Sequence, residues 1–223
     1  SGYDGSWFPV LDGKAGADYF LIGRDLIDKR LTFVVDNAAD KITFLKGSGI
    51  VYVNSSINYT LSEELTNLRL LSNASAISAT GNSRNNIIRG NQYDNQMSGL
   101  DGNDTLLGYG GKDTLIGGAG DDVYYIGDSG SVALTGEAQD SWAASLSDMG
   151  SIVEDASGGY DIVRYGTSGY SFYPYNLTVP YNVEKFIFTS NSKTQFTING
   201  NDQSNIIEFN TWTGSLATVL GLG

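Results

Sequence analysis

The chain has 223 residues, of which 29 are Gly and none is His or Cys, and its 25 acidic residues against 13 basic ones give a formal net charge of −12. This composition excludes disulfides and thiol nucleophiles, removes the commonest general base and zinc ligand, and argues against nucleic acid or anionic membranes as partners. Hydrophobic residues make up 40% of the chain, enough for a folded core, so the acidic charge does not indicate disorder.

Residues 1–80 are predicted to form a first unit of short β-strands. Apolar runs such as YFLIG, LTFVV and GIVYV are bounded by Gly, Asn, Asp and Ser, which is typical of strands separated by turns. Neither this unit nor the rest of the chain has an apolar run long enough for a membrane-spanning helix, and no signal peptide is visible. Within the unit, GKAGADYFL (13–21) carries two glycines three residues apart and then Asp18, a candidate metal ligand.

A glycine recurs every nine residues in the segment 81–125, at positions 81, 90, 99, 108 and 117. The stretches that it opens are GNSRNNIIR, GNQYDNQMS, GLDGNDTLL, GYGGKDTLI and GGAGDDVYY, and the last three fit G-x-x-G-x-D-x-U-x, where U is a large apolar residue. Each copy is predicted to be a six-residue polar turn and a three-residue strand, with the position-eight side chain in the core. Two copies then make one coil of about eighteen residues, with strands on two sides and turns at two edges.

Stacking of such coils predicts a metal site at the turns. Alternate turns lie over one another, which brings Asp104 above Asp122, and two carboxylates with exposed glycine carbonyls make an all-oxygen cage. Ca²⁺ prefers about six to eight oxygen ligands and tolerates irregular geometry, whereas Mg²⁺ needs a stricter octahedron. Transition metals prefer imidazole or thiolate, which this chain lacks. Calcium is therefore the predicted cofactor.

The predicted calcium ligands are side chains and carbonyl groups of these turns. About two or three well-formed sites are expected near residues 99–122, with weak or empty ones before them, because the first two copies lack Gly at position four and Asp at position six. Ordinary turns of a β protein also use Gly, Asn and Asp, but they would not repeat in phase five times. The candidate residues are Gly99, Asp101, Gly102, Asp104, Gly108, Gly111, Asp113, Gly117, Gly118, Gly120 and Asp122, together with Asn86, Asn95 and Asp18.

On these residues the chain resembles the RTX family of haemolysin-type calcium-binding proteins, which are exported by type I secretion. The clear resemblance covers residues 81–125, roughly a fifth of the chain. It implies an all-β fold, a right-handed parallel β-roll or β-helix that forms a calcium-binding solenoid with irregular flanking strands. Since binding energy at sites absent from the unfolded chain becomes folding energy, we expect a chain that stays extended inside the cell and folds on calcium outside.

Residues 126–223 are predicted to form a second unit that is similar to the first. YNLTVPYNVEKFIF (175–188) parallels INYTLSEELTNLRL (57–70), and GNDQSNIIEFN (200–210) parallels GNSRNNIIRGN (81–91). In the same way GGAGDDVYY parallels GKAGADYFL, which aligns Asp18 with Asp122. This internal duplication predicts units 1–80, 81–125 and 126–223, and it indicates a window on a longer protein. The pattern leaves open whether the flanks continue the solenoid or form separate lobes.

Two further features of the sequence bear on function. One short helix is expected at 140–148, with Asp140 as its cap. The three Trp residues (Trp7, Trp142 and Trp212) and the Tyr-rich segment 169–182 could stack on sugars or fill a protein interface, but we favour strand and cap residues. No enzyme is predicted: no Ser lies in a G-x-S-x-G elbow, and the carboxylates are interpreted as calcium ligands and turn residues, although some glycosidases work with carboxylates alone.

The expected function is that of a calcium-folded structural module of a large secreted or cell-surface protein, either an adhesin or an S-layer-like protein, because long surface fibres extend by tandem units. The alternatives are the secretion and folding domain of an exported protease, lipase or epimerase, and the repeat block of a pore-forming toxin. The expected partners are calcium ions and a carbohydrate or protein at a cell surface, with no nucleic acid and no membrane span. The expected location is extracellular.

Overall fold

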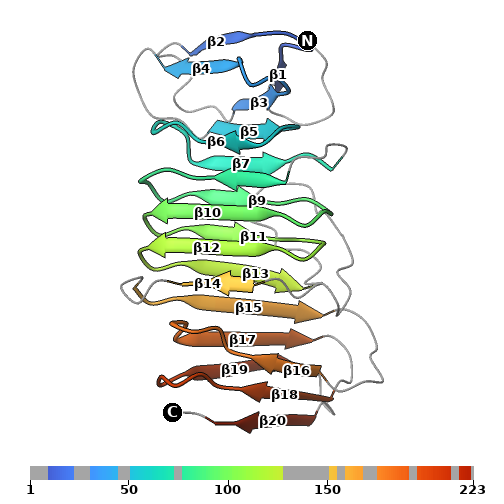
Figure 1. The fold of residues 1–223 in the computed structure, drawn as a ribbon, viewed down its shortest axis with the longest axis vertical. Coiled ribbons are helices and arrows are strands. Elements are labelled where there is room, and N and C mark those ends of the chain that lie inside the picture. Colours follow the sequence, from blue (N-terminus) through green and yellow to red (C-terminus); the bar gives the residue numbers. More distant parts are fainter. Residues whose placement is uncertain are drawn as a thin grey trace.

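The fold is described by a computed structural model at residues 10–22, 31–44, 51–72, 77–127, 151–154, 159–167, 175–190, 195–211 and 216–221. Every regular element among these residues is a β-strand, and the strands stack into an elongated molecule (Figure 1). The helix expected at 140–148 and the three Trp residues lie outside the described residues. In the part of the chain that is described, no helix has the length and apolar character needed to span a membrane.

One face of the molecule is a parallel sheet of ten strands that runs along the whole stack (Figure 1). Because it takes strands from all three sequence units, the described flanks continue the solenoid of the repeats in one stack. Its members are β1 (Val10–Asp12), β3 (Leu31–Val35), β5 (Val51–Ser55), β7 (Asn67–Leu70), β9 (Ile87–Arg89), β11 (Thr105–Leu107), β13 (Val123–Gly127), β15 (Ile162–Thr167), β17 (Lys185–Ser190) and β19 (Ile206–Thr211).

The opposite face is divided into three smaller sheets, in which the paired strands are also parallel. The chain alternates between the two faces, so its turns gather at two edges. At the first edge the chain passes from an even-numbered strand into the ten-stranded sheet, and at the second edge it leaves that sheet. The three sheets are β2 (Tyr19–Ile22) with β4 (Lys41–Phe44); β6 (Tyr59–Thr60), β8 (Ser78–Thr80), β10 (Gln96–Asp101), β12 (Thr114–Ala119) and β14 (Ser151–Val153); and β16 (Tyr175–Thr178), β18 (Gln195–Asn199) and β20 (Leu216–Leu220).

The length of one coil is constant in the repeats and varies outside them. Backbone and side-chain partners at the turns of residues 81–125 are 18 residues apart, as two nine-residue copies per coil predict. The next coil is much longer, since partners across it are 39 residues apart. In the C-terminal part the partners are 23 residues apart between Asp161 and Glu184. The flanks therefore keep the stack while losing the period.

The core changes with coil length. In the repeats the position-eight side chains are fully buried, as predicted. In the longer coils aromatic rings fill the interior, and the centroids of Phe188 and Phe196 lie 4.1 Å apart while those of Tyr165 and Phe188 lie 5.7 Å apart. Larger side chains are needed there because the interior of a wider coil must still be closely packed. The position-eight residues are Ile88, Met97, Leu106, Leu115 and Tyr124.

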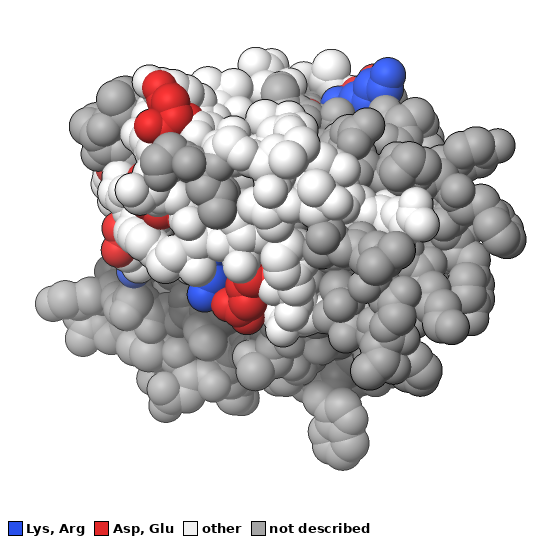
Figure 2. Space-filling model, turned by 90° about the horizontal axis from the view of Figure 1, so that it is seen from below, with Lys and Arg blue, Asp and Glu red and all other residues white. Residues whose placement is uncertain are grey.

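The end of the stack that carries β20 has little charge. Seen along the stack from below, its described surface is mostly uncharged, and acidic side chains stand in small groups near the margin (Figure 2). Within the repeats, the acidic residues lie in the turns or, for Asp101, at the end of a strand, so the candidate metal ligands lie along the edges of the stack.

Candidate calcium sites

The three G-x-x-G-x-D turns share a backbone conformation that explains the second glycine. Position four is Gly102, Gly111 and Gly120, with φ angles of 110°, 93° and 132°. Position two also has positive φ, 82° at Leu100 and 65° at Tyr109. Positive φ is free for glycine and costly for other residues, so glycine at position four lowers the strain of a turn that needs this conformation twice.

The position-one glycine is required by space. A Cβ atom added at Gly99 would lie closer than 3.0 Å to Asp104 Oδ2 and to the carbonyl oxygen of Gly117. A Cβ atom at Gly108 would meet Asp113 Oδ2 in the same way. A carboxylate oxygen and, at Gly99, a carbonyl oxygen of the next coil therefore occupy the space that any larger side chain would fill.

Position-six side chains form a ladder along the first edge. The N–H of Asn86 donates to Asp104 Oδ1 at 2.6 Å, and the N–H of Asp104 donates to Asp122 Oδ1 at 2.7 Å. The ladder goes on outside the repeats, from the N–H of Asp122 to Asp161 Oδ1 at 2.8 Å and from the N–H of Asp161 to Glu184 Oε2 at 2.8 Å. We call these five residues the position-six column. The predicted stacking of Asp104 on Asp122 is thus present.

The ladder uses only one oxygen of each aspartate. Asp104, Asp122 and Asp161 are 1%, 0% and 1% exposed, and the Oδ2 atom of each is buried without a hydrogen-bond partner. Burial raises the pKa of Asp104 and Asp122 to about 7 and that of Asp161 to about 6; the donated N–H lowers each pKa in part, and neighbouring carboxyls raise it again. A buried carboxylate is costly unless it is paired. These oxygens are suited to a divalent cation that prefers oxygen, which fits calcium.

A second ladder, at position five, connects the same turns, but here the N–H of the later coil donates to the side chain of the earlier coil. The side chain of Asn85 accepts from the N–H of Asn103 at 3.0 Å, that of Asn103 from Asp121 at 3.1 Å, and that of Asp121 from Tyr160 at 2.8 Å. The sequence pattern did not indicate this ladder. In the structure these exposed side chains also tie each coil to the next one.

The two asparagine copies close their turns with amide pairs. Asn86 Oδ1 accepts from the N–H of Asn82 at 2.8 Å, and Asn86 Nδ2 donates back to Asn82 Oδ1 at 3.0 Å. Asn91 and Asn95 repeat this pair, at 2.7 Å and 3.1 Å. Both polar atoms of the Asn86 amide are thus hydrogen bonded within the turn, so this amide needs no cation. That Asn86 or Asn95 ligates calcium remains a prediction.

Similar ladders exist at the second edge. Asp113 Oδ1 accepts from the N–H of Asn95 at 2.9 Å, so Asp113 corresponds to Asp104 on this edge. Asp18 also lies at the second edge, near the N-terminal end of the stack, where its N–H donates to Asp40 Oδ1 at 2.9 Å. The sequence aligns Asp18 with Asp122, but the fold places them at different edges. Asp101 is exposed and adds charge near Asp104.

The sequence did not identify Asp161 and Glu184 as members of the position-six column. A signal was present, because Gly159 and Asp161 repeat positions four and six of the motif, and Gly159 has a φ of 122°. The nine-residue period hides it, since the coil that separates Asp161 from Asp122 is 39 residues long.

The comparison with protein families agrees with this geometry. The family model described as RTX calcium-binding nonapeptide repeat (4 copies) matches the chain at residues 80–115, 89–124 and 98–131. Neither the curated proteins nor the solved structures give a significant match. The matched segment contains the turns with paired glycines and the parts of both ladders that lie within the repeats. Residues 80–131 are therefore RTX calcium-binding nonapeptide repeats, and the solenoid that they form is a structural domain that binds calcium ions.

Proposed function

We propose that this chain is a calcium-folded structural module of a secreted or cell-surface protein. The observation that carries the proposal is the set of three stacked aspartates, each with a buried Oδ2 atom that has no partner in the chain. A chain that buries such groups without a cation loses much of its stability, whereas a chain that binds calcium there gains the binding energy as folding energy.

This dependence suits export from the cell. Extracellular calcium modules commonly bind at about 10⁻⁴–10⁻³ M, which is above the calcium level of a cytosol. The chain would therefore remain unfolded during type I secretion and fold on reaching the outside. The lack of Cys fits the same route, because no disulfide has to form.

Among surface proteins, we favour an adhesin or an S-layer-like protein. The support is the ten-stranded sheet, which joins the repeats to both flanks in one stack, and the sequence parallels between units 1–80 and 126–223. A module of this kind lengthens a fibre by adding coils along one axis. The alternatives are the secretion domain of an exported enzyme and the repeat block of a toxin. In all three cases we assign the chain no catalytic role, and its partners besides calcium would be carbohydrate or protein at a cell surface.

A calcium titration of the purified chain tests the proposal. Far-UV circular dichroism in EDTA should show little β structure, and calcium should induce it with a midpoint near about 0.1–1 mM. Magnesium is the matched control and should not replace calcium, since it sheds water reluctantly. A chain that is equally folded in EDTA and in calcium would overturn the proposal.

A further inference from the structure

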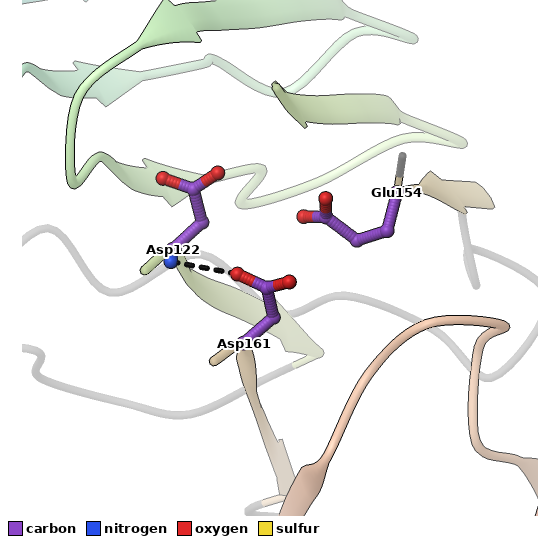
Figure 3. Close-up of side chains that lie close together, drawn as sticks. All are labelled: Asp122, Glu154 and Asp161. Atoms are coloured by element: carbon purple, nitrogen blue, oxygen red, sulfur yellow. Dashed lines mark hydrogen bonds between the residues drawn. The ribbon is translucent and has the colours of Figure 1, made fainter. Parts of the chain in front are cut away.

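We propose a calcium site outside the nonapeptide repeats, formed by Asp122, Glu154 and Asp161. One carboxylate oxygen from each residue lies within 4.8 Å of the others, and the three carboxyl groups face a common space (Figure 3). The family match ends at residue 131, so two of the three ligands lie beyond it. This inference rests on the proposed calcium-folded function and adds a ligand type that the repeats lack, a glutamate.

Strand pairing explains how Glu154 reaches the site. Strand β14 pairs with β12 so that Val153 lies beside Ile116. Glu154, the next residue, therefore corresponds to Gly117 in the coil before. Glu154 thus occupies position one, which is glycine in the repeats. The segment from Glu154 to Asp161 has two more residues than the turn from Gly117 to Asp122.

Gly159 and Asp161, at the end of this segment, keep the form of a calcium turn. Gly159 has the positive φ of position four, and a Cβ atom there would meet the carbonyl oxygen of Gly120, so the two glycines stack. Asp161 then takes position six and accepts from the N–H of Asp122 at 2.8 Å. The insertion that lengthens this coil therefore leaves the ladder intact and exchanges one glycine for a carboxylate.

Two of the three carboxyl groups need a partner. Asp122 and Asp161 are 0% and 1% exposed, and their Oδ2 atoms have no hydrogen-bond partner. In the described part of the chain no Lys or Arg forms an ion pair with either residue, and the charges that act on them come from other carboxyls. Three carboxylates so close together repel one another strongly unless a cation lies between them.

The third carboxyl group is held in place by its neighbours. The hydroxyl of Tyr124 donates to Glu154 Oε1, and the side-chain amide of Asn182 donates to the backbone carbonyl of Glu154 at 3.2 Å. The Tyr124 hydroxyl and Asp122 Oδ2 also share the space beside Gly117. The three carboxyl groups offer oxygen ligands, and a set of oxygens with several negative charges is the donor set that calcium binds.

Counting bound calcium in wild type and in Glu154→Gln tests this inference. Glu154→Gln keeps the size of the side chain and an acceptor for Tyr124 but removes a charge. Glu64→Gln is the matched control: Glu64 is an exposed turn residue, and its substitution removes the same charge far from the site. Bound calcium per chain is measured by equilibrium dialysis with elemental analysis, in calcium high enough to fold every variant, and folding is checked by circular dichroism.

The expected result is that Glu154→Gln and Asp161→Asn each lose one bound ion per chain, while Glu64→Gln binds as many ions as wild type. If Glu154→Gln binds as many ions as wild type with the same affinity, the site does not exist, although the repeats still bind calcium. If wild type binds no calcium at all, the proposed function itself fails. If Glu154→Gln does not fold, Asp161→Asn and Tyr124→Phe decide, and unchanged ion counts in both would overturn the inference.

Discussion

Replacing Asp104 by Asn should change the stability of the protein in opposite directions with and without calcium. Asp104 Oδ1 accepts the N–H of Asn86 at 2.6 Å, and an amide oxygen keeps this hydrogen bond. The Oδ2 atom has no partner, and burial raises the pKa of Asp104 from 3.8 to about 7. At pH 8 without calcium, ionised Asp104 therefore costs the folded state about 4 kcal/mol, since each unit of pKa is worth about 1.4 kcal/mol.

The gain from removing this charge is partly offset. The new amide nitrogen has no acceptor at position two, which is Leu100, and a buried donor without a partner costs about 1–3 kcal/mol. We expect Asp104→Asn to stabilise the calcium-free fold by about 1–3 kcal/mol and to weaken calcium binding, because a charged ligand is lost. Adding Leu100→Asn should raise the calcium-free stability further, because Asn tolerates the φ of 82° at this position and its amide oxygen offers the new amide nitrogen an acceptor.

Folding without calcium can be measured by adding an osmolyte in EDTA, because osmolytes favour burial of surface. By circular dichroism, Asp104→Asn should fold at a lower osmolyte concentration than wild type, and in EDTA-free buffer it should need more calcium. Asp202→Asn, at an exposed turn position outside the calcium turns, is the control and should behave as wild type. A variant that is less stable than wild type both in EDTA and in calcium would refute the reasoning, because Asp104 would then not carry an uncompensated charge.

Three other predictions concern the same stack. The aspartates of the position-six column have folded-state pKa values of about 6–7, against an ordinary value of 3.8, so the folded chain binds more protons than the unfolded chain. The calcium-free fold should therefore lose stability as the pH rises from about 4 to 7. Circular dichroism in EDTA at pH 5 and pH 8 measures this loss. Gly102→Ala, at a φ of 110° and against the backbone of Arg84, should cost about 2 kcal/mol or more in denaturant unfolding with calcium, whereas Gly110→Ala, with room for a Cβ, should cost much less. Phe188→Ala should cost about 3–5 kcal/mol in the same assay, and an unchanged midpoint would contradict the aromatic core.

The regular part of the fold could be predicted because it depends on local chemistry. A residue such as Leu106 is apolar, follows a polar turn and recurs every nine residues, so its burial follows from the period alone. The pairing of Asp104 with Asp122 follows as well, because two copies make a coil. The glycine at position four reports the turn conformation, and the glycine at position one reports the lack of space for a side chain.

The remainder of the fold and of the candidate site depends on contacts between coils, and no regular spacing in the sequence shows which residues make these contacts. Asp161 belongs to the position-six column although 39 residues separate it from Asp122, and no repeat in the sequence predicts a coil of that length. The sequence alignment of Asp18 with Asp122 detects the same turn but not its edge, which depends on the number of strands between them. The position-five ladder was missed because a side chain such as Asn103 finds its partner on another coil.

The asparagine turns show where the requirement for calcium must lie. Asn82 reaches back to the carbonyl oxygens of Ser62 and Leu65, and Asn201 makes the same two bonds to Pro180 and Val183. In these turns neutral amides supply both donors and acceptors, so each turn closes on the coil before it without a charge. In the aspartate turns between them at the first edge, Asp104, Asp122 and Asp161 each accept one backbone N–H and each leave one buried oxygen without a partner. A cation would satisfy these oxygens, and because the ladder joins each turn to the next, each aspartate turn positions an oxygen beside its neighbour. At the first edge, turns closed by neutral amides therefore lie on both sides of the aspartate turns whose negative charge calcium would neutralise.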